Sequence, residues 1–145
     1  MAVTADQVAT LRAFLARDFD RYERLHAQLD PVAAKTGYTA LIAAAFIEAV
    51  DRRFHQDSTD SDVVEFVGAV RAQFDRDGDE IDPIVAERMI RAVYTDEDID
   101  DIDTETLVGN QVVLLSALIA EENLDDSELD AFLAKAGELA DQWTS

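Results

Sequence analysis

Apolar residues recur at every third or fourth position along almost the whole chain, and this spacing limits the possible folds more than any other feature. It is the period of a helix with one buried face, whereas a half-buried strand would alternate apolar and polar residues. Glycine and proline, which interrupt helices, number only 5 and 2 among 145 residues. The sequence therefore predicts an all-α protein.

Residues typical of helix starts divide this pattern into five to six main helices. The first is expected to begin after Thr4, with Gln7 completing a capping box, and to continue to Leu29. Asp30 and Pro31 then predict a short helical turn that Gly37 closes. The later helices are expected at residues 38–55, 63–74, 83–94, 104–122 and 126–143.

Two of the predicted helices, 38–55 and 104–122, are apolar nearly all round, so we expect them at the centre of the bundle. No linker or low-complexity tract separates the helices, and residues 1–145 are expected to form a single acidic domain. An apolar helix, an acidic cap and an amphipathic helix occur twice, at 38–74 and at 107–143. This repetition suggests a weak internal duplication of a helix pair, with chance similarity as the alternative.

Negative charge is the strongest chemical feature. The chain has 32 acidic and 12 basic residues, for a net charge of −20, and residues 75–145 alone carry −17. Such a surface disfavours direct nucleic-acid binding, which requires lysine and arginine to neutralise phosphates. It favours a non-enzymatic protein–protein interaction module with a basic protein partner. Mimicry of nucleic acid and simple adaptation to salt are the alternatives.

The acidic loop 75–82 is the candidate site for a divalent cation. Asp75, Asp77 and Asp79 occupy the first, third and fifth positions of a calcium-binding loop and supply the oxygen ligands that calcium prefers. The loop resembles the start of an EF-hand, but Glu80 stands where that motif has glycine and Ala86 where it has glutamate. A divalent-cation or small-ligand-binding protein is therefore an alternative function, and an ordinary acidic loop is the simpler interpretation.

Motifs of catalysis are missing from the sequence. It has no cysteine, no glycine-rich phosphate loop and no serine in a nucleophile elbow, so we expect no enzyme activity and no cofactor. His26, Glu48, Asp51 and His55 are the residues that could form a metal cluster. The simpler expectation is that Glu48 pairs with Arg52, one turn further along the same helix.

The beginning of the chain has neither a basic leader nor a continuous apolar stretch, and the longest apolar run is too short to span a membrane. We therefore expect a cytoplasmic protein without membrane contact. The apolar stripe of the first predicted helix is a candidate seam for a homodimer, although one bundle could bury it equally well. Its residues are Val8, Leu11, Leu15, Tyr22 and Leu25.

Overall fold

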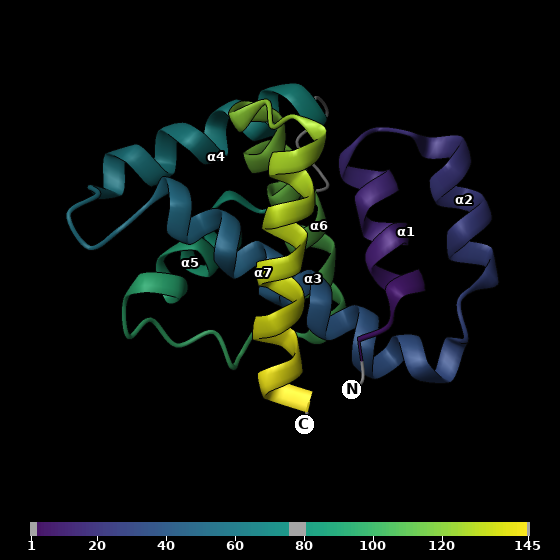
Figure 1. Ribbon diagram of the computed structural model, residues 1–145. Coiled ribbons are helices and arrows are strands. Elements are labelled where there is room, and N and C mark those ends of the chain that lie inside the picture. Colours follow the sequence, from purple (N-terminus) through teal and green to yellow (C-terminus); the bar gives the residue numbers. More distant parts are fainter. Residues whose placement is uncertain (1–2, 76–80, 145) are drawn as a thin grey trace.

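The computed structural model describes residues 3–75 and 81–144, and this part of the chain forms seven helices and no strand (Figure 1). The all-α prediction is confirmed. The helices are α1 (Ala5–Leu15), α2 (Phe19–Gln28), α3 (Pro31–Arg53), α4 (Asp60–Phe74), α5 (Pro83–Tyr94), α6 (Thr104–Glu122) and α7 (Asp126–Thr144).

α3 is the central helix, as predicted for residues 38–55. It packs against α1, α5, α6 and α7, and Figure 1 shows it crossing behind α7 with α1 and α2 on one side and α4 and α5 on the other. Small side chains make this crowding possible, because Ala44, Ala45 and Ala49 are completely buried. α6 is the second central helix, and its Leu114 and Leu115 are completely buried too. One continuous core joins all the helices except α2.

The predicted helix starts are largely confirmed. Thr4 and Gln7 form the expected capping box, with hydrogen bonds of 3.2 Å and 3.1 Å. Asp30 and Asp82 cap α3 and α5 immediately before proline. At the end of α6, Asn123 adopts the expected left-handed conformation with φ of 51°.

The prediction of one helix from Thr4 to Leu29 is wrong. The chain turns at residues 16–18, where Arg17 has a left-handed φ of 62° and Asp18 caps a new helix by accepting from Arg21 N at 3.4 Å. An aspartate side chain competes with helical hydrogen bonds in this way, which makes it a good helix start and a poor interior residue. α2 therefore folds back beside α1 (Figure 1).

The prediction of a short turn closed by Gly37 is also wrong, because α3 runs without interruption from Pro31 to Arg53 and contains Gly37. A glycine inside a helix costs only about 0.5–1 kcal/mol relative to alanine, which the buried packing of the following turns exceeds. The break at residues 16–18, not this fusion, accounts for the seventh helix of the described chain, where five to six main helices were expected.

The internal duplication is not confirmed. In a repeated helix pair, α4 would pack on α6 as α7 packs on α3. α7 lies along α3 over much of its length, whereas α4 packs mainly against α5 and touches α6 briefly.

Most residues of the proposed dimer seam pack in or against the core of their own chain. Leu11 and Leu15 are 2% and 9% exposed, and Val8 packs against the same core. Self-association of two copies through the remaining residues stays a prediction.

Within the described residues, α3 is long and apolar enough to cross a membrane, with a mean hydropathy of 1.2 over 18 residues. Half of that stretch is buried inside the fold, as in the core helix of a soluble protein.

Candidate functional site

The connection from α5 into the first turn of α6 carries the densest negative charge in the chain. We call residues 96–105 the acidic segment. Seven of its ten residues are acidic, namely Asp96, Glu97, Asp98, Asp100, Asp101, Asp103 and Glu105.

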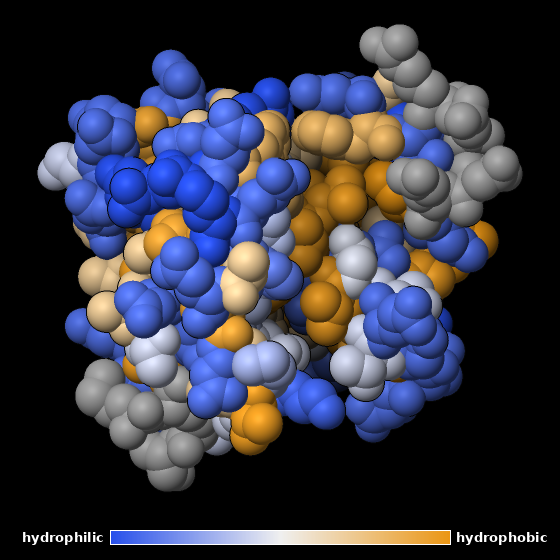
Figure 2. Space-filling model, turned by 90° about the vertical axis from the view of Figure 1, so that its right-hand side faces the viewer, coloured by the Kyte–Doolittle hydropathy of each residue, from blue (hydrophilic) through white to orange (hydrophobic). Residues whose placement is uncertain are grey.

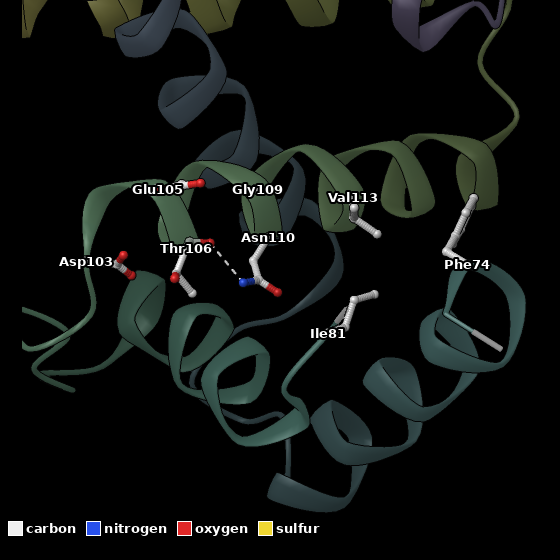
Figure 3. Close-up of a pocket in the computed structure, with 8 residues that line it drawn as sticks. All are labelled: Phe74, Ile81, Asp103, Glu105, Thr106, Gly109, Asn110 and Val113. Carbon is white, nitrogen blue, oxygen red and sulfur yellow. Dashed lines mark hydrogen bonds between the residues drawn. The ribbon is translucent and has the colours of Figure 1, made fainter. Parts of the chain in front are cut away.

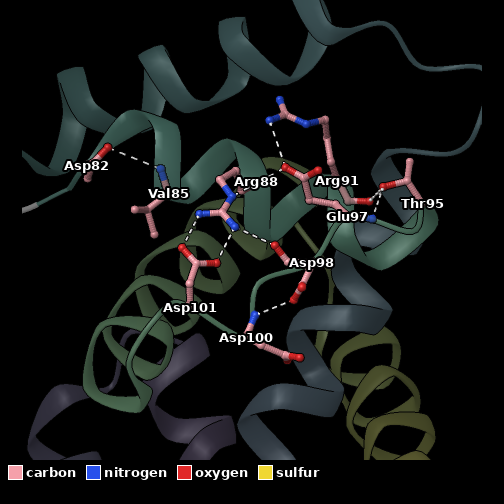
Figure 4. Close-up of polar contacts among 9 residues, drawn as sticks. All are labelled: Asp82, Val85, Arg88, Arg91, Thr95, Glu97, Asp98, Asp100 and Asp101. Carbon is pink, nitrogen blue, oxygen red and sulfur yellow. Dashed lines mark hydrogen bonds and ion pairs between the residues drawn. The ribbon is translucent and has the colours of Figure 1, made fainter.

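Two arginines of α5 face the acidic segment (Figure 4). Arg88 donates to both carboxylate oxygens of Asp101, at 3.0 Å and 2.6 Å, and to the carbonyl of Asp98 at 2.6 Å. These hydrogen bonds from Arg88 hold the pKa of Asp101 below its ordinary value of 3.8, and the same bonds raise the pKa of Arg88. Arg88 and Arg91 each lie 3.6 Å from Glu97. The two arginines therefore fix the middle of the segment to α5.

Four carboxylates of the acidic segment form no ion pair or side-chain hydrogen bond with the described part of the chain. They are Asp96, Asp100, Asp103 and Glu105, and all four residues are exposed. Asp103 occupies the N-cap position of α6 without using its side chain as a cap. These four groups are free to bind a positively charged molecule.

A second acidic region lies where α6 meets α7, and we call residues 121–130 the acidic corner. Here arginines from the first half of the chain pair with the carboxylates. Arg12 contacts Asp130 at 2.6 Å and Asp126 at 3.4 Å, and these two acids raise the pKa of Arg12. Two further pairs join Arg52 to Glu122 at 2.7 Å and Arg53 to Glu121 at 3.4 Å. The remaining acids, Asp125 and Glu128, cap the start of α7.

One end of the acidic segment borders a pocket of about 430 Å³, which we call the α6 pocket (Figure 3). Asp103, Glu105 and Thr106 lie at its polar end, and Phe74, Ile81 and Val113 form its apolar wall. Its volume falls in the range of roughly 300–1,000 Å³ that is usual for small-molecule sites. The described residues that line it are Phe74, Ile81, Asp103, Glu105, Thr106, Gly109, Asn110 and Val113.

Asn110 is the buried polar residue of the α6 pocket, only 7% exposed. Its Nδ2 donates to the carbonyl of Thr106 at 2.8 Å. Because a carbonyl can only accept, this bond fixes the amide orientation and leaves Oδ1 facing the pocket. Figure 3 shows this oxygen on the side of Ile81, and it accepts no hydrogen bond from the residues that the structure describes.

A second, more apolar groove of about 280 Å³ lies between α1, α2, α3 and α6. Figure 2, which faces the α1 and α2 side, shows hydrophobic residues lining a hollow in a mostly hydrophilic surface. A chain of rings from Phe14 through Tyr22 and His26 to Tyr38 borders the groove, with centroids 5.2–6.1 Å apart. Burial, with a smaller contribution from neighbouring Tyr22, raises the pKa of Tyr38. The groove therefore combines an apolar lining with the polar groups of Tyr22, His26, Tyr38 and Thr39, none of which is acidic.

The predicted cation site falls only partly within the described structure. Asp77 and Asp79 lie outside the described residues. Asp75 is 5% exposed, and its Oδ2 accepts a hydrogen bond from Ile81 N at 2.8 Å. In residues 3–75 and 81–144, no group of three or more histidine, aspartate or glutamate side chains is placed to hold a metal ion.

The alternative cluster of histidines and acids is not assembled. α3 ends at Arg53, so His55 lies beyond the helix, where its Nδ1 accepts from Asp57 N at 3.3 Å. His26 belongs to the ring chain of the apolar groove. Glu48 contacts Lys135 of α7 at 3.2 Å, and the predicted Glu48–Arg52 pair is wrong.

Sequence reasoning missed the α6 pocket. Asn110 was the available signal, because it falls between Leu107 and Leu114 on the inward face of an otherwise apolar helix. A polar residue at such a position requires a hydrogen-bond partner or a cavity. The contributions of Phe74 and Ile81 follow only from the packing of the chain.

Comparison of the chain with protein-family models, with curated proteins and with solved structures finds no match.

Proposed function

We propose that the protein is a non-enzymatic interaction module that binds a basic protein partner through the acidic segment. The observation that carries this proposal is the set of four exposed carboxylates without intramolecular partners, Asp96, Asp100, Asp103 and Glu105. In the acidic corner, by contrast, the carboxylates already have partners within the chain.

The fixed backbone of the segment supports the same function. Arg88 and Arg91 attach its middle to α5, so less conformational freedom would be lost on binding than for a free acidic tail. Clustered negative charge also speeds encounter with a positively charged surface. Both effects favour rapid, salt-sensitive binding.

The test compares two variants with the same change in net charge. Asp96→Asn/Asp100→Asn neutralises the acidic segment, and Glu65→Gln/Glu138→Gln neutralises two exposed acids elsewhere. Each protein is immobilised and exposed to native lysate at about 0.01 M and about 0.15 M ionic strength, where the Debye lengths are roughly 30 Å and 8 Å. Retained basic proteins are identified and quantified.

We expect the wild type and the Glu65/Glu138 variant to retain the same basic protein, and the Asp96/Asp100 variant to retain at least about threefold less. Equal loss in both variants would show that only total charge matters and would contradict the proposal. Displacement of the retained protein by short duplex DNA would instead support nucleic-acid mimicry, because the segment would then occupy a DNA-binding surface.

A further inference from the structure

The α6 pocket combines three features that suit one kind of ligand. It has an inward-facing amide oxygen, two carboxylates at its polar end and an apolar wall. We propose that it receives an arginine side chain of the basic partner. This inference rests on the proposed function and names the site at which the partner is recognised.

The side chain of Asn110 favours a ligand with a hydrogen-bond donor. The residue is more than nine-tenths buried, and its amide orientation is fixed by the 2.8 Å bond from Nδ2 to the carbonyl of Thr106. The Oδ1 atom therefore presents an acceptor to the pocket, as Figure 3 shows. This oxygen accepts no hydrogen bond from the described chain, so a ligand that supplies an N–H group can form one at this point.

The charges at the polar end specify a cation. Asp103 and Glu105 both line the pocket, and neither pairs with a basic group of the described chain. The N-terminus of α6 carries roughly half a positive charge from the helix dipole, which repels a cation. The two negative charges of the carboxylates outweigh this repulsion. A guanidinium group has five donors and no acceptor, so it suits a pocket that offers carboxylates and an amide oxygen.

The apolar wall specifies the stem of the ligand. Phe74, Ile81 and Val113 provide the surface against which the methylene groups of an arginine side chain can pack. Gly109 leaves the side of the pocket open, because a Cβ built at this position meets no atom within 4 Å. A larger residue at position 109 would fit on α6 and occupy the pocket.

The first experiment measures binding of a small probe by backbone NMR. N-acetyl-arginine amide is titrated into the wild type, into Gly109→Leu, which fills the pocket, and into Asn110→Leu, which removes the acceptor at similar volume. Gly68→Leu is the matched control, since its Cβ also meets nothing within 4 Å and Gly68 lies on α4 outside the α6 pocket. The neutral citrulline analogue tests the requirement for charge.

We expect probe-dependent shifts at residues 103–113 of the wild type and of Gly68→Leu. Affinity should fall by at least about tenfold in Gly109→Leu and in Asn110→Leu, and the citrulline analogue should bind about tenfold more weakly than the arginine probe. The absence of shifts in the wild type, or equal binding by Gly109→Leu, would overturn the proposal. Because the two variants act on different features, loss of folding in one leaves the other as the test.

The second experiment separates this inference from the proposed function. The retained basic protein is compared between the wild type and Gly109→Leu, which have the same charge. Retention weakened by at least about fivefold supports the pocket as the recognition site. Equal retention overturns the pocket proposal and leaves the acidic segment as the binding surface. If the Asp96/Asp100 variant retains as much as the wild type, the proposed function fails, and the probe titration still decides whether the pocket binds arginine.

Discussion

The acidic segment and the acidic corner contain similar runs of carboxylates, yet the fold treats them differently. In the corner, Arg12, Arg52 and Arg53 reach across from the first half of the chain. In the segment, Arg88 and Arg91 of the preceding helix are the only basic side chains of the described residues in contact, and four carboxylates have no partner among those residues. A count of charges along the sequence therefore overstates the negative charge that the acidic corner exposes. For the acidic segment the same count is close to what the structure exposes. The difference depends on which basic side chains the tertiary structure brings near.

The largest expected effect comes from removing the support beneath the acidic corner. Phe132 is 1% exposed, and the guanidinium of Arg52 lies 5.8 Å from the centre of its ring. Phe132→Ala should lower the free energy of unfolding by about 3–5 kcal/mol, the usual range for a buried phenylalanine. Urea denaturation measures the loss. Ile84→Ala is the control, because Ile84 is 66% exposed and should change stability by less than about 0.5 kcal/mol. Similar midpoints for the two variants would contradict the assigned core.

A smaller effect is expected from breaking one pair of the corner. Arg52 donates to Glu122 Oε1 at 3.0 Å and 2.7 Å, and both side chains are partly exposed. Arg52→Gln should reduce stability by about 0.5–1 kcal/mol, the upper half of the range for exposed pairs. A double-mutant cycle with Glu122→Gln isolates the pair from other effects of each substitution. A coupling energy of zero would show that the corner is no better stabilised than the segment.

The comparison itself is tested by two variants of equal charge at low salt. Asp126→Asn/Asp130→Asn removes the partners of Arg12 and should lower the melting temperature. Asp96→Asn/Asp100→Asn relieves repulsion among neighbouring carboxylates and should raise it. Each shift in melting temperature corresponds to a change of about 0.3 kcal/mol in the free energy of unfolding. Both shifts should shrink at about 0.15 M salt, where the Debye length is about 8 Å. Shifts of the same sign in both variants would remove the distinction between the regions.

The most local effect concerns the titration of Asp101. Its carboxylate is stabilised by Arg88, so its folded-state pKa is below the ordinary value of 3.8. A carboxyl group of this kind stabilises the fold above the ordinary pKa, and the contribution is lost as the pH falls through the lowered value. Carboxyl-carbon NMR should show the pKa of Asp101 returning toward 3.8 in Arg88→Gln. An unchanged titration would mean that the contact is not formed in solution.

The fold class was predictable because helical periodicity and capping residues are local signals. Thr4 and Asp82 start helices through bonds to residues two or three positions away, so the sequence contains both partners. The break at Arg17 and Asp18 was missed because the apolar spacing continues through it. Asp18 is the local signal for this break, because its side chain caps α2, and the packing of α2 against α1 accompanies the turn.

The candidate site was less predictable for a related reason. The excess of acid in residues 75–145 is evident in the composition, but the neutralisation of the corner depends on arginines that lie 68–118 positions away. Asn110 is a polar residue on an apolar face, a signal that was not recognised in the sequence. Its place in a pocket could not be predicted, because the pocket also depends on Phe74 and Ile81, which are distant in sequence from α6.

The position of α2 has a consequence for the dynamics of the protein. None of its residues is buried, and its backbone lies close to α1 alone. Its attachment depends on a few ring contacts, Phe14 with Phe19 and Tyr22, and His26 with Tyr38. Such an element opens with a free energy far below that of global unfolding. The amides of residues 19–28 should therefore exchange with deuterium as one group while those of α3 stay protected, and proteases should cut first near Arg17, at the boundary of this small cooperative unit.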